Sequence, residues 1–325
     1  MPSSITHAYF GNDLYKSFEK QIRSKINGEM FKTFNQGPDI LFFYNIVNLK
    51  CGKSVRNFGK YMQKHKTRDF FVNLITYVKD NNLYNNKDVV TFMYGFISHY
   101  VLDMTVHPFV FYKTGIYDSK NKNTYKYNGL HNDMETAIDC YLINNYEKIK
   151  PKYFKVHKFC FNIKPFSNKL NKTIDCVFKS TFNKDNMSSI YYNSIKHMKL
   201  SFRVLRYDPT GIKLTIYKLL DFILPNFISK KSSLSYSINY KRKMHYLNMD
   251  KNAWNHPKDL YEVYNYSFIE LYCIALKRAL ELINKVDIYI NNNMDIKYLK
   301  ELFPDLSYTS GKKCKINKET RYFQF

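Results

Sequence analysis

The stretch GFISHYVLDMTVHPF (residues 95–109) decides how the rest of the chain is interpreted. His99, Asp103 and His107 follow one another at four-residue spacing, which places them on one face of an α-helix with neighbouring side chains ~6 Å apart. They lie inside an apolar run, residues 89–110. Burying a carboxylate and two imidazoles is costly unless something pairs with them. The pattern therefore predicts a core helix that carries a polar face of metal-ligand type.

A second stretch, HNDMETAID (residues 131–139), has the same spacing in His131, Glu135 and Asp139. One such pair alone is usually structural, because a buried His is commonly hydrogen-bonded in a core and an Asp on a helix is commonly solvated. We call each of these series, His99/Asp103/His107 and His131/Glu135/Asp139, a ladder. Two ladders so close in the chain favour a multinuclear metal site built from imidazole and carboxylate ligands. For Asp139 two interpretations stay open, an acceptor for a ligand His or a polar helix residue.

The composition sets the class of protein and the charge of its partners. A chain of 325 residues, 45% of them hydrophobic, is long enough for one large domain or two ordinary ones with a buried core. A formal net charge of +24 favours anionic partners such as phospholipid head groups, membrane surfaces or nucleic acid. The sequence has no helix-turn-helix signature, zinc-finger spacing or aromatic RNA-binding motif, which argues against specific nucleic-acid recognition.

Several features of the sequence bear on the cellular compartment of the protein. The six cysteines are scattered without a C-x-x-C pair, as expected for free thiols in a reducing compartment. The start MPSSITHAYFGNDLY is not a secretory signal, and no uninterrupted apolar run reaches ~18 residues. We therefore expect a cytoplasmic protein, with peripheral contact to an anionic membrane surface as a further expectation. Segment 212–229, with Lys213, Lys218 and Asp221, predicts an amphipathic helix packed on the body or, alternatively, a surface that meets lipid.

The periodicity along the chain is helical, and strand-like alternation is confined to short stretches near 152–164. Asp39 follows a Gly-Pro turn and is placed to cap a short helix, while Pro108 is expected to mark the end of the first ladder helix. Helices are predicted at residues 12–26, 40–47, 54–64, 67–80, 86–106, 130–147, 186–204, 210–224 and 257–286. A loop is expected at 113–128.

This pattern predicts an all-α protein made of one multi-helix domain over residues 1–325. The metal-site motifs fall in 1–140, a helical C-terminal half in 150–305 and a basic, irregular tail in 306–325.

The motifs, in this order, resemble the zinc-dependent phospholipase C family, whose all-helical fold is shared with the S1/P1-type nucleases. The resemblance rests on His7, Asp39 in GPDILFFY, His65, His99, Asp103, His107, His131 and Glu135. The late stretch YLNMDKNAWNHP and the segment SFIELYCIALKRAL are similar to the C-terminal part of bacterial members without a signal peptide. The resemblance thus touches most of the chain, with its specific motifs in the first 140 residues.

The resemblance implies up to three zinc ions as cofactors. The first ion would be held by Asp39, His65, His99 and Asp103, and the second by His107, His131 and Glu135. The third would be held by His7, Asp103 and the amino terminus, which becomes Pro2 if the initiator Met1 is removed. Asp103 would bridge two metals, and Asp39 would also act as the general base that orients the attacking water. Zinc suits this role because it takes nitrogen and oxygen ligands and activates water at neutral pH.

The function expected from the resemblance is a hydrolase of phosphodiester bonds, which cleaves glycerophospholipids to diacylglycerol and a phosphorylated head group. Two alternatives stay open: a nuclease or other phosphodiesterase on the same scaffold, and a protein in which zinc only stabilises the fold. The chain departs from the secreted enzymes in the closer spacing of Asp103 and His107, in lacking a Trp near its start, and in having no C-terminal β-sandwich. The head group and the oligomeric state are not specified by the sequence.

Overall fold

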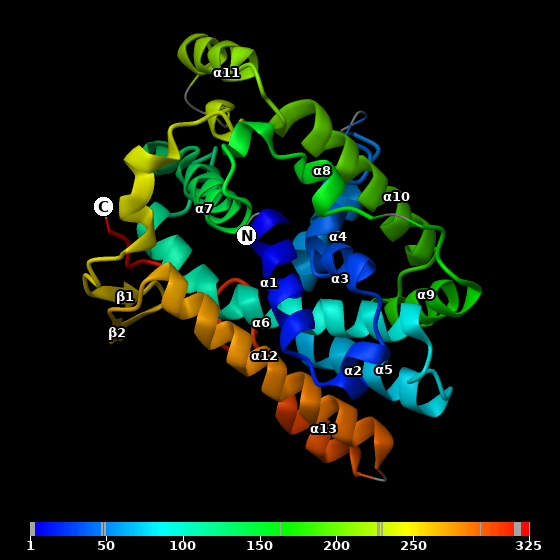
Figure 1. Cartoon of the computed structure of the whole chain (residues 1–325). Helices are drawn as coiled ribbons and strands as arrows, with labels where there is room; N and C mark the ends of the chain where they lie inside the picture. Colours follow the sequence, from blue (N-terminus) through cyan, green and yellow to red (C-terminus); the bar gives the residue numbers. More distant parts are fainter. Residues whose placement is uncertain are drawn as a thin grey trace.

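The computed structural model describes residues 4–46, 48, 50–162, 164–225, 228, 230–292, 294–314 and 320–324. Helices dominate these residues and the described strands form one short antiparallel pair, so the predicted all-α fold class is confirmed (Figure 1). The α-helices are α1 (Ser4–Ser17), α2 (Lys20–Ser24), α3 (Gly28–Phe34), α4 (Lys53–Met62), α5 (Thr67–Asp80), α6 (Lys87–Thr114), α7 (Leu130–Glu147), α8 (Val156–Phe159), α9 (Asn168–Phe182), α10 (Met187–Ser201), α11 (Ile212–Ile223), α12 (Phe268–Asn291) and α13 (Ile296–Leu302). The shorter elements are η1 (Gly37–Phe43), η2 (Lys122–Tyr127), η3 (Pro151–Tyr153), η4 (Phe202–Arg206), η5 (Ser232–Leu234), η6 (Tyr240–Leu247), β1 (Trp254–His256) and β2 (Asp259–Tyr264).

Helix α6 is the centre of the fold, and α12 packs along it (Figure 1). The Asn86 side chain caps α6 by accepting a hydrogen bond from the Val89 N–H. Among the described helices, α6 alone is long and apolar enough to cross a membrane, but 94% of its most apolar window is buried inside the protein. Because neighbouring helices surround α6, apolar side chains on all its faces find core partners. Its composition is therefore that of a core helix.

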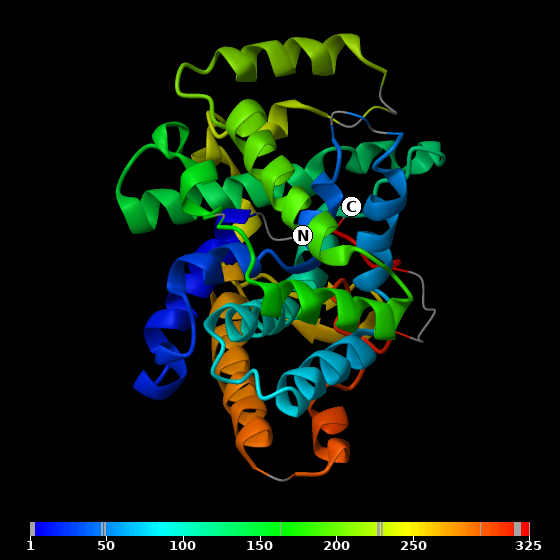
Figure 2. The same cartoon turned by 90° about the vertical axis from the view of Figure 1, so that its right-hand side faces the viewer.

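Helices α1, α3 and α7 and the short η1 gather around the middle of α6. Helix α1 contacts α3, α6, α7 and α12, while η1 packs between α4 and α10. This arrangement brings residues from four separate segments to one face of α6 (Figures 1 and 2).

Several predicted element boundaries were wrong. The helix expected at 12–26 is instead α1, which begins at Ser4, followed by α2. Helix α6 does not end at Pro108 but continues to Thr114, because proline removes one hydrogen-bond donor while buried neighbours such as Phe109 and Val110 hold the remaining turns. The residues near 152–164 contain η3 and α8 rather than strands.

Two further differences concern the C-terminal half. The helix expected from 257 begins only at Phe268, where Ser267 and Glu270 form a reciprocal capping box. The residues before it contain β2, which pairs with β1. Helix α9 was not predicted; the part of the expected helix at 40–47 that is described is η1, with residue 47 outside the described residues.

Candidate metal centre

Four side chains from three elements form a buried group of ligand-type atoms, here called the first donor group: His7, Asp39, His99 and Asp103. One nitrogen or carboxylate oxygen from each lies within 4.8 Å of those of the others. His99 and Asp103 come from α6, His7 from α1 and Asp39 from η1. All four residues are buried. Side chains from three segments of the chain, up to 96 positions apart, thus converge on one point, as the two ladders and the resemblance predicted.

Asp103 lies at the middle of this arrangement. Its Oδ1 is 3.3 Å from His7 Nε2, and its Oδ2 is 3.1 Å from His99 Nε2. The His99 Nε2 atom is also 3.8 Å from Asp39 Oδ1. The rings of His7 and His99 are stacked, with their centroids 4.2 Å apart. One carboxylate therefore faces two imidazole nitrogens at the same time.

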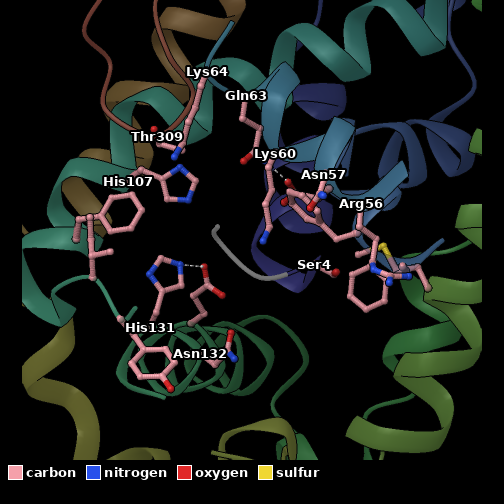
Figure 3. Close-up of a pocket in the computed structure, with 18 of the residues that line it drawn as sticks. Ser4, Arg56, Asn57, Lys60, Gln63, Lys64, His107, His131, Asn132 and Thr309 are labelled. Carbon is pink, nitrogen blue, oxygen red and sulfur yellow. Dashed lines mark hydrogen bonds and ion pairs between the residues drawn. The ribbon is translucent and has the colours of Figure 1, made fainter. Parts of the chain in front are cut away.

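The second donor group consists of His107, His131 and Glu135, whose ligand atoms also lie within 4.8 Å of one another. His131 and Glu135 are one turn apart on α7, with Nε2 and Oε1 at 3.0 Å. His107 comes from α6 and connects the two groups, because its Nδ1 is 3.7 Å from Asp103 Oδ2. In Figure 3 the labelled His107 and His131 rings lie near one another on the same side of a cavity.

Backbone carbonyls fix the orientation of two of the imidazoles. His99 Nδ1 lies 3.1 Å from the carbonyl oxygen of Asn35, and His107 Nδ1 lies 2.9 Å from that of Tyr308. A protonated Nδ1 donates to each carbonyl, which leaves Nε2 of both rings as a lone-pair donor. This is the usual way in which proteins orient metal-binding histidines.

Burial favours the uncharged form of two imidazoles, those of His7 and His107. Burial acts in the same direction on His99, but the facing carboxylates of Asp103 and Asp39 outweigh it and raise the pKa of His99. Burial, helped by the neighbouring His99, lowers the pKa of His7 to about 4. Burial also lowers the pKa of His107 to about 3. The same desolvation raises the pKa of Asp39 to about 8, while the facing His99 opposes this change. Two neutral imidazoles and a carboxyl group that is poorly solvated are a donor set that a cation would stabilise.

The hydrogen bonding of these groups fits a metal. Among the residues that the structure describes, several buried polar atoms find no hydrogen-bond partner, and they concentrate here: Nε2 of His7, His99 and His107, and both carboxylate oxygens of Asp103. Buried polar atoms nearly always have a hydrogen-bond partner, and each one without a partner lowers the stability of the fold by ~1–3 kcal/mol. Nitrogen and oxygen donors at this spacing are the ligand set that zinc prefers. The residues present therefore fit one or more zinc ions.

The two donor groups open onto a cavity of about 730 Å³. Asp39, His107, His131 and Glu135 line its inner end. Basic side chains stand on its walls: Arg56, Lys60, Lys64 and Arg206. Apolar side chains complete the lining: Phe42, Phe43, Phe111, Ile116, Met198 and Phe202. Figure 3 shows Lys60 and Arg56 on the wall across from the two histidines. The cavity thus offers cationic and apolar contacts beside the metal-ligand atoms.

The structure does not bring His65 to either donor group. Helix α4 ends at Met62, and the chain then turns through Lys66, whose φ of 57° is left-handed. His65 is exposed and stacks on Tyr61, with ring centroids 4.4 Å apart. The position expected for it beside Asp39 is taken by Gln63, whose Nε2 donates to Asp39 Oδ1 at 2.5 Å. Gln63 carries no metal-motif signal in the sequence, so spacing alone did not indicate it.

The remaining predicted positions have different outcomes. Pro2, expected as a ligand through a free amino terminus, lies outside the described residues. Asp139 lies one turn beyond Glu135 on α7 and is buried. It accepts hydrogen bonds from the Thr6 backbone N–H at 3.0 Å, from the Thr6 hydroxyl at 2.9 Å and from the Tyr236 hydroxyl at 2.7 Å. Asp139 therefore ties α7 to the residue that precedes His7.

The C-terminal segment supports the site, although the sequence indicated only an irregular tail. The Tyr308 carbonyl orients His107, and the Tyr308 N–H donates to the Gln63 carbonyl at 2.9 Å. The Ser307 hydroxyl donates to the same carbonyl at 3.1 Å. The segment is irregular in its backbone but positions one ligand-type histidine and the partner of Asp39. Contacts through backbone atoms leave no residue-type signal, so sequence reasoning could not find them.

The geometry agrees with the comparison to protein families. The model of the family described as "Zinc dependent phospholipase C" matches residues 6–197, well over half of the chain. This range contains both donor groups and ends within α10. Comparison with curated proteins and with solved structures gave no match.

Proposed function

Since the chain belongs to the zinc dependent phospholipase C family and hence to the zinc-dependent hydrolases, we propose that it cleaves the phosphodiester bond between diacylglycerol and the head group of a glycerophospholipid. The observation that carries the proposal is the meeting of two donor groups at the inner end of one cavity with both cationic and apolar walls. A phospholipid offers the matching pair, an anionic phosphodiester and acyl chains.

The donor sets favour more than one zinc ion. The first donor group would hold one ion through Asp39, His99 and Asp103, with Gln63 orienting Asp39. The second donor group would hold another through His107, His131 and Glu135. A third ion, shared by His7 and Asp103, is part of the proposal and needs a further ligand. When bound, zinc supplies Lewis acidity toward the phosphodiester and makes a nucleophilic water available near neutral pH.

The protein's own residues have separate tasks in this proposal. Asp103 faces both donor groups and neutralises the positive charge between them. Asp39 lines the cavity and accepts the proton of the attacking water. Lys60 and Arg56 stand on the opposite wall, where they hold the phosphate oxygens and stabilise the charge that develops on them (Figure 3). Apolar residues such as Phe42 and Phe202 exclude water and contact the acyl chains.

The test begins with metal analysis of the purified full chain and continues with a substrate panel. Short-chain phosphatidylcholine, phosphatidylglycerol and single-stranded DNA are incubated with the zinc-loaded protein. We expect bound zinc, release of diacylglycerol from at least one lipid, loss of turnover on chelation and recovery on adding zinc. Cleavage of DNA without lipid turnover would establish the nuclease alternative. Zinc binding that raises the melting temperature without any turnover would establish a zinc-stabilised, non-catalytic protein.

A variant pair tests the role assigned to the cavity wall. Lys60→Gln removes a charge that faces the donor groups, and it should lower kcat/KM about 10- to 100-fold without changing zinc content. The control Lys300→Gln changes an exposed lysine on α13, away from the cavity, and should behave as wild type. Equal activity of the Lys60 variant and the control would remove the basic wall from the mechanism.

A further inference from the structure

Helix α11 presents its apolar side to solvent instead of to the protein. None of its described residues is buried. Ile212, Ile216, Leu219 and Ile223 form one stripe along the helix, and all four are exposed. Phe222 beside this stripe is 88% exposed. Figures 1 and 2 show α11 at the outer edge of the molecule, apart from the helices around α6.

The polar side of α11 holds the helix on the body. Lys213, Tyr217 and Asp221 follow one another at four-residue spacing and therefore share one face. The Lys213 ammonium donates to the carbonyl oxygens of Val204 at 2.6 Å and Tyr207 at 2.8 Å, and the Tyr217 hydroxyl donates to that of Leu205 at 3.0 Å. These contacts fix the orientation of the helix, so the apolar stripe on its other side faces solvent.

The amino-terminal end of α11 is fixed in a similar way. The buried Asp208 accepts hydrogen bonds from the backbone N–H groups of Gly211 and Leu214, at 3.0 and 2.9 Å. At the other end, Asp221 accepts from the N–H groups of Lys231 and Ser232. A helix that is held at both ends with its apolar side outward is built to present that side to a partner.

A basic groove lies next to α11. It is lined by Lys155, His157, Lys158, Lys196, Lys199, Leu200, Arg203 and Tyr207, and no acidic residue is among these described lining residues. Tyr207 belongs to the groove and also accepts from Lys213 of α11, so the two features are neighbours. Burial and the charges of Arg203 and Lys158 lower the pKa of His157, which reflects the concentration of positive charge. The exposed Leu200, Val204 and Leu205 continue the apolar surface between groove and helix.

We propose that α11 and the basic groove beside it form a docking surface for an anionic phospholipid bilayer. In this arrangement the apolar stripe of α11 enters the boundary between head groups and acyl chains, as amphipathic helices do at membrane interfaces. The cations of the groove contact lipid phosphates and bind more weakly as salt is added. Charge also disfavours a second copy of the chain as the occupant, since two such faces of a chain with net charge +24 would repel each other.

The inference builds on the proposed function but does not depend on it. Helix α11 lies beyond the matched family segment, residues 6–197. Met198, Phe202 and Arg206 line the cavity, and Arg206 directly precedes the groove residue Tyr207 in the chain. A bilayer held at α11 would therefore lie close to one wall of the cavity. Binding to vesicles can be measured without any turnover, so docking and catalysis can fail separately.

The experiment measures sedimentation of the full-length protein with vesicles of phosphatidylcholine alone and of phosphatidylcholine mixed with phosphatidylglycerol. Wild type should bind the mixed vesicles and not the neutral ones, and added salt should release it. The double variant Ile216→Ser/Phe222→Ser removes exposed apolar surface and should weaken binding about tenfold or more. The double variant Lys158→Gln/Arg203→Gln should weaken binding by about tenfold and reduce the salt dependence.

Matched controls change two exposed apolar residues and two exposed cationic residues at the opposite end of the molecule (Figure 1). Ile288→Ser/Ile296→Ser alters two exposed apolar residues of α12 and α13, and Lys297→Gln/Lys300→Gln alters two exposed lysines of α13. Both controls should bind as wild type. The proposal is overturned if wild type ignores anionic vesicles or if the α11 variant binds as well as its control. It is also overturned if wild type is a dimer that the α11 variant converts to monomer.

A second readout separates docking from the proposed function. Hydrolysis of monomeric short-chain phosphatidylcholine should be the same in wild type and the α11 variant, while hydrolysis of mixed vesicles should fall in the variant. Turnover of the soluble substrate without vesicle binding overturns docking alone. Vesicle binding without turnover of any lipid overturns the proposed function alone.

Discussion

The two donor groups use the same residue types on neighbouring helices, yet they differ in access to solvent. In the first group, His7, His99 and Asp103 are fully enclosed, and Asp39 alone of its members lines the cavity. In the second group the His131 side chain is 29% exposed, and all three members line the cavity. Four-residue spacing on a helix thus produces a closed site or an open one, depending on what covers the ladder. The closed group is suited to hold a metal firmly, and the open group to exchange water and substrate.

Asp103 is the residue that joins the two groups, so changing it should have the largest effect. Asp103→Asn keeps the shape of the side chain but removes the charge that faces His7, His99 and His107. We expect kcat on the best substrate of the panel to fall more than about a thousandfold, with the helical content retained. Steady-state kinetics, zinc analysis and far-ultraviolet circular dichroism measure the three outcomes.

The control for this variant is Asp80→Asn, which changes an exposed carboxylate at the end of α5. It should leave kcat and zinc content unchanged. If the Asp103 variant retains wild-type activity and zinc content, the two donor groups do not share a charge and Asp103 does not join them.

The closed group should take up zinc with release of a proton. Burial raises the pKa of Asp39 to about 8, so the metal-free protein holds a proton there at neutral pH. Zinc binds the ionised carboxylate, so its affinity should rise as the pH increases toward 8, by about 50-fold from pH 6 to pH 8. Titration calorimetry in buffers of different ionisation enthalpy counts the protons released.

His107 of the open group provides the contrast, because its pKa of about 3 leaves it neutral throughout this pH range. The variant Asp39→Asn should therefore remove one released proton and flatten the pH dependence, while leaving the His107 contribution as it was. A proton count that is identical in wild type and Asp39→Asn would show that Asp39 is already ionised before the metal binds.

A change at Gln63, which orients Asp39 of the first donor group, should have a smaller effect on zinc binding. The Gln63 Nε2 donates to Asp39 Oδ1 at 2.5 Å, at the position beside Asp39 where the sequence predicts His65. Gln63→Ala removes the donor that orients Asp39, and zinc affinity of the first donor group should fall about 10- to 100-fold. Competition with a fluorescent chelator measures the affinity, and Gln21→Ala on the exposed side of α2 is the control. An unchanged affinity would mean that the metal alone fixes Asp39.

The extent to which the site could be predicted follows from the kind of information each residue carries. His99, Asp103, His107, His131 and Glu135 were predictable because a helix converts four-residue spacing directly into a shared face. His7 and Asp39 lie far away in the chain and were indicated only by the family resemblance. Which ladder would be closed and which open depends on packing, which spacing does not encode.

The failures have equally local causes. His65 was expected beside Asp39, but the last turn of α4 ends at Met62 and leaves Gln63 facing the site. The support from Tyr308 comes through its backbone, which has no residue-type signature. For α11 the sequence predicted an amphipathic helix correctly but not its orientation. That orientation is set by tertiary contacts of Lys213 and Tyr217 rather than by hydrophobic burial.

Asp139 provides the smallest expected effect and tests whether a ladder position must be a ligand. It shares the helical face of His131 and Glu135, yet it accepts hydrogen bonds from Thr6 and Tyr236. Asp139→Asn keeps the volume but replaces a charged acceptor, so the free energy of unfolding should fall by ~1–3 kcal/mol. Because the carboxylate holds α1 and not a metal, zinc content should stay at the wild-type value and kcat within about twofold. Thermal or urea unfolding followed by zinc analysis separates the two roles, with Tyr236→Phe, which deletes one donor, giving a smaller loss of ~1 kcal/mol. A large drop in zinc content at unchanged stability would instead make Asp139 part of the metal centre, and the α7 ladder would then continue for a further turn.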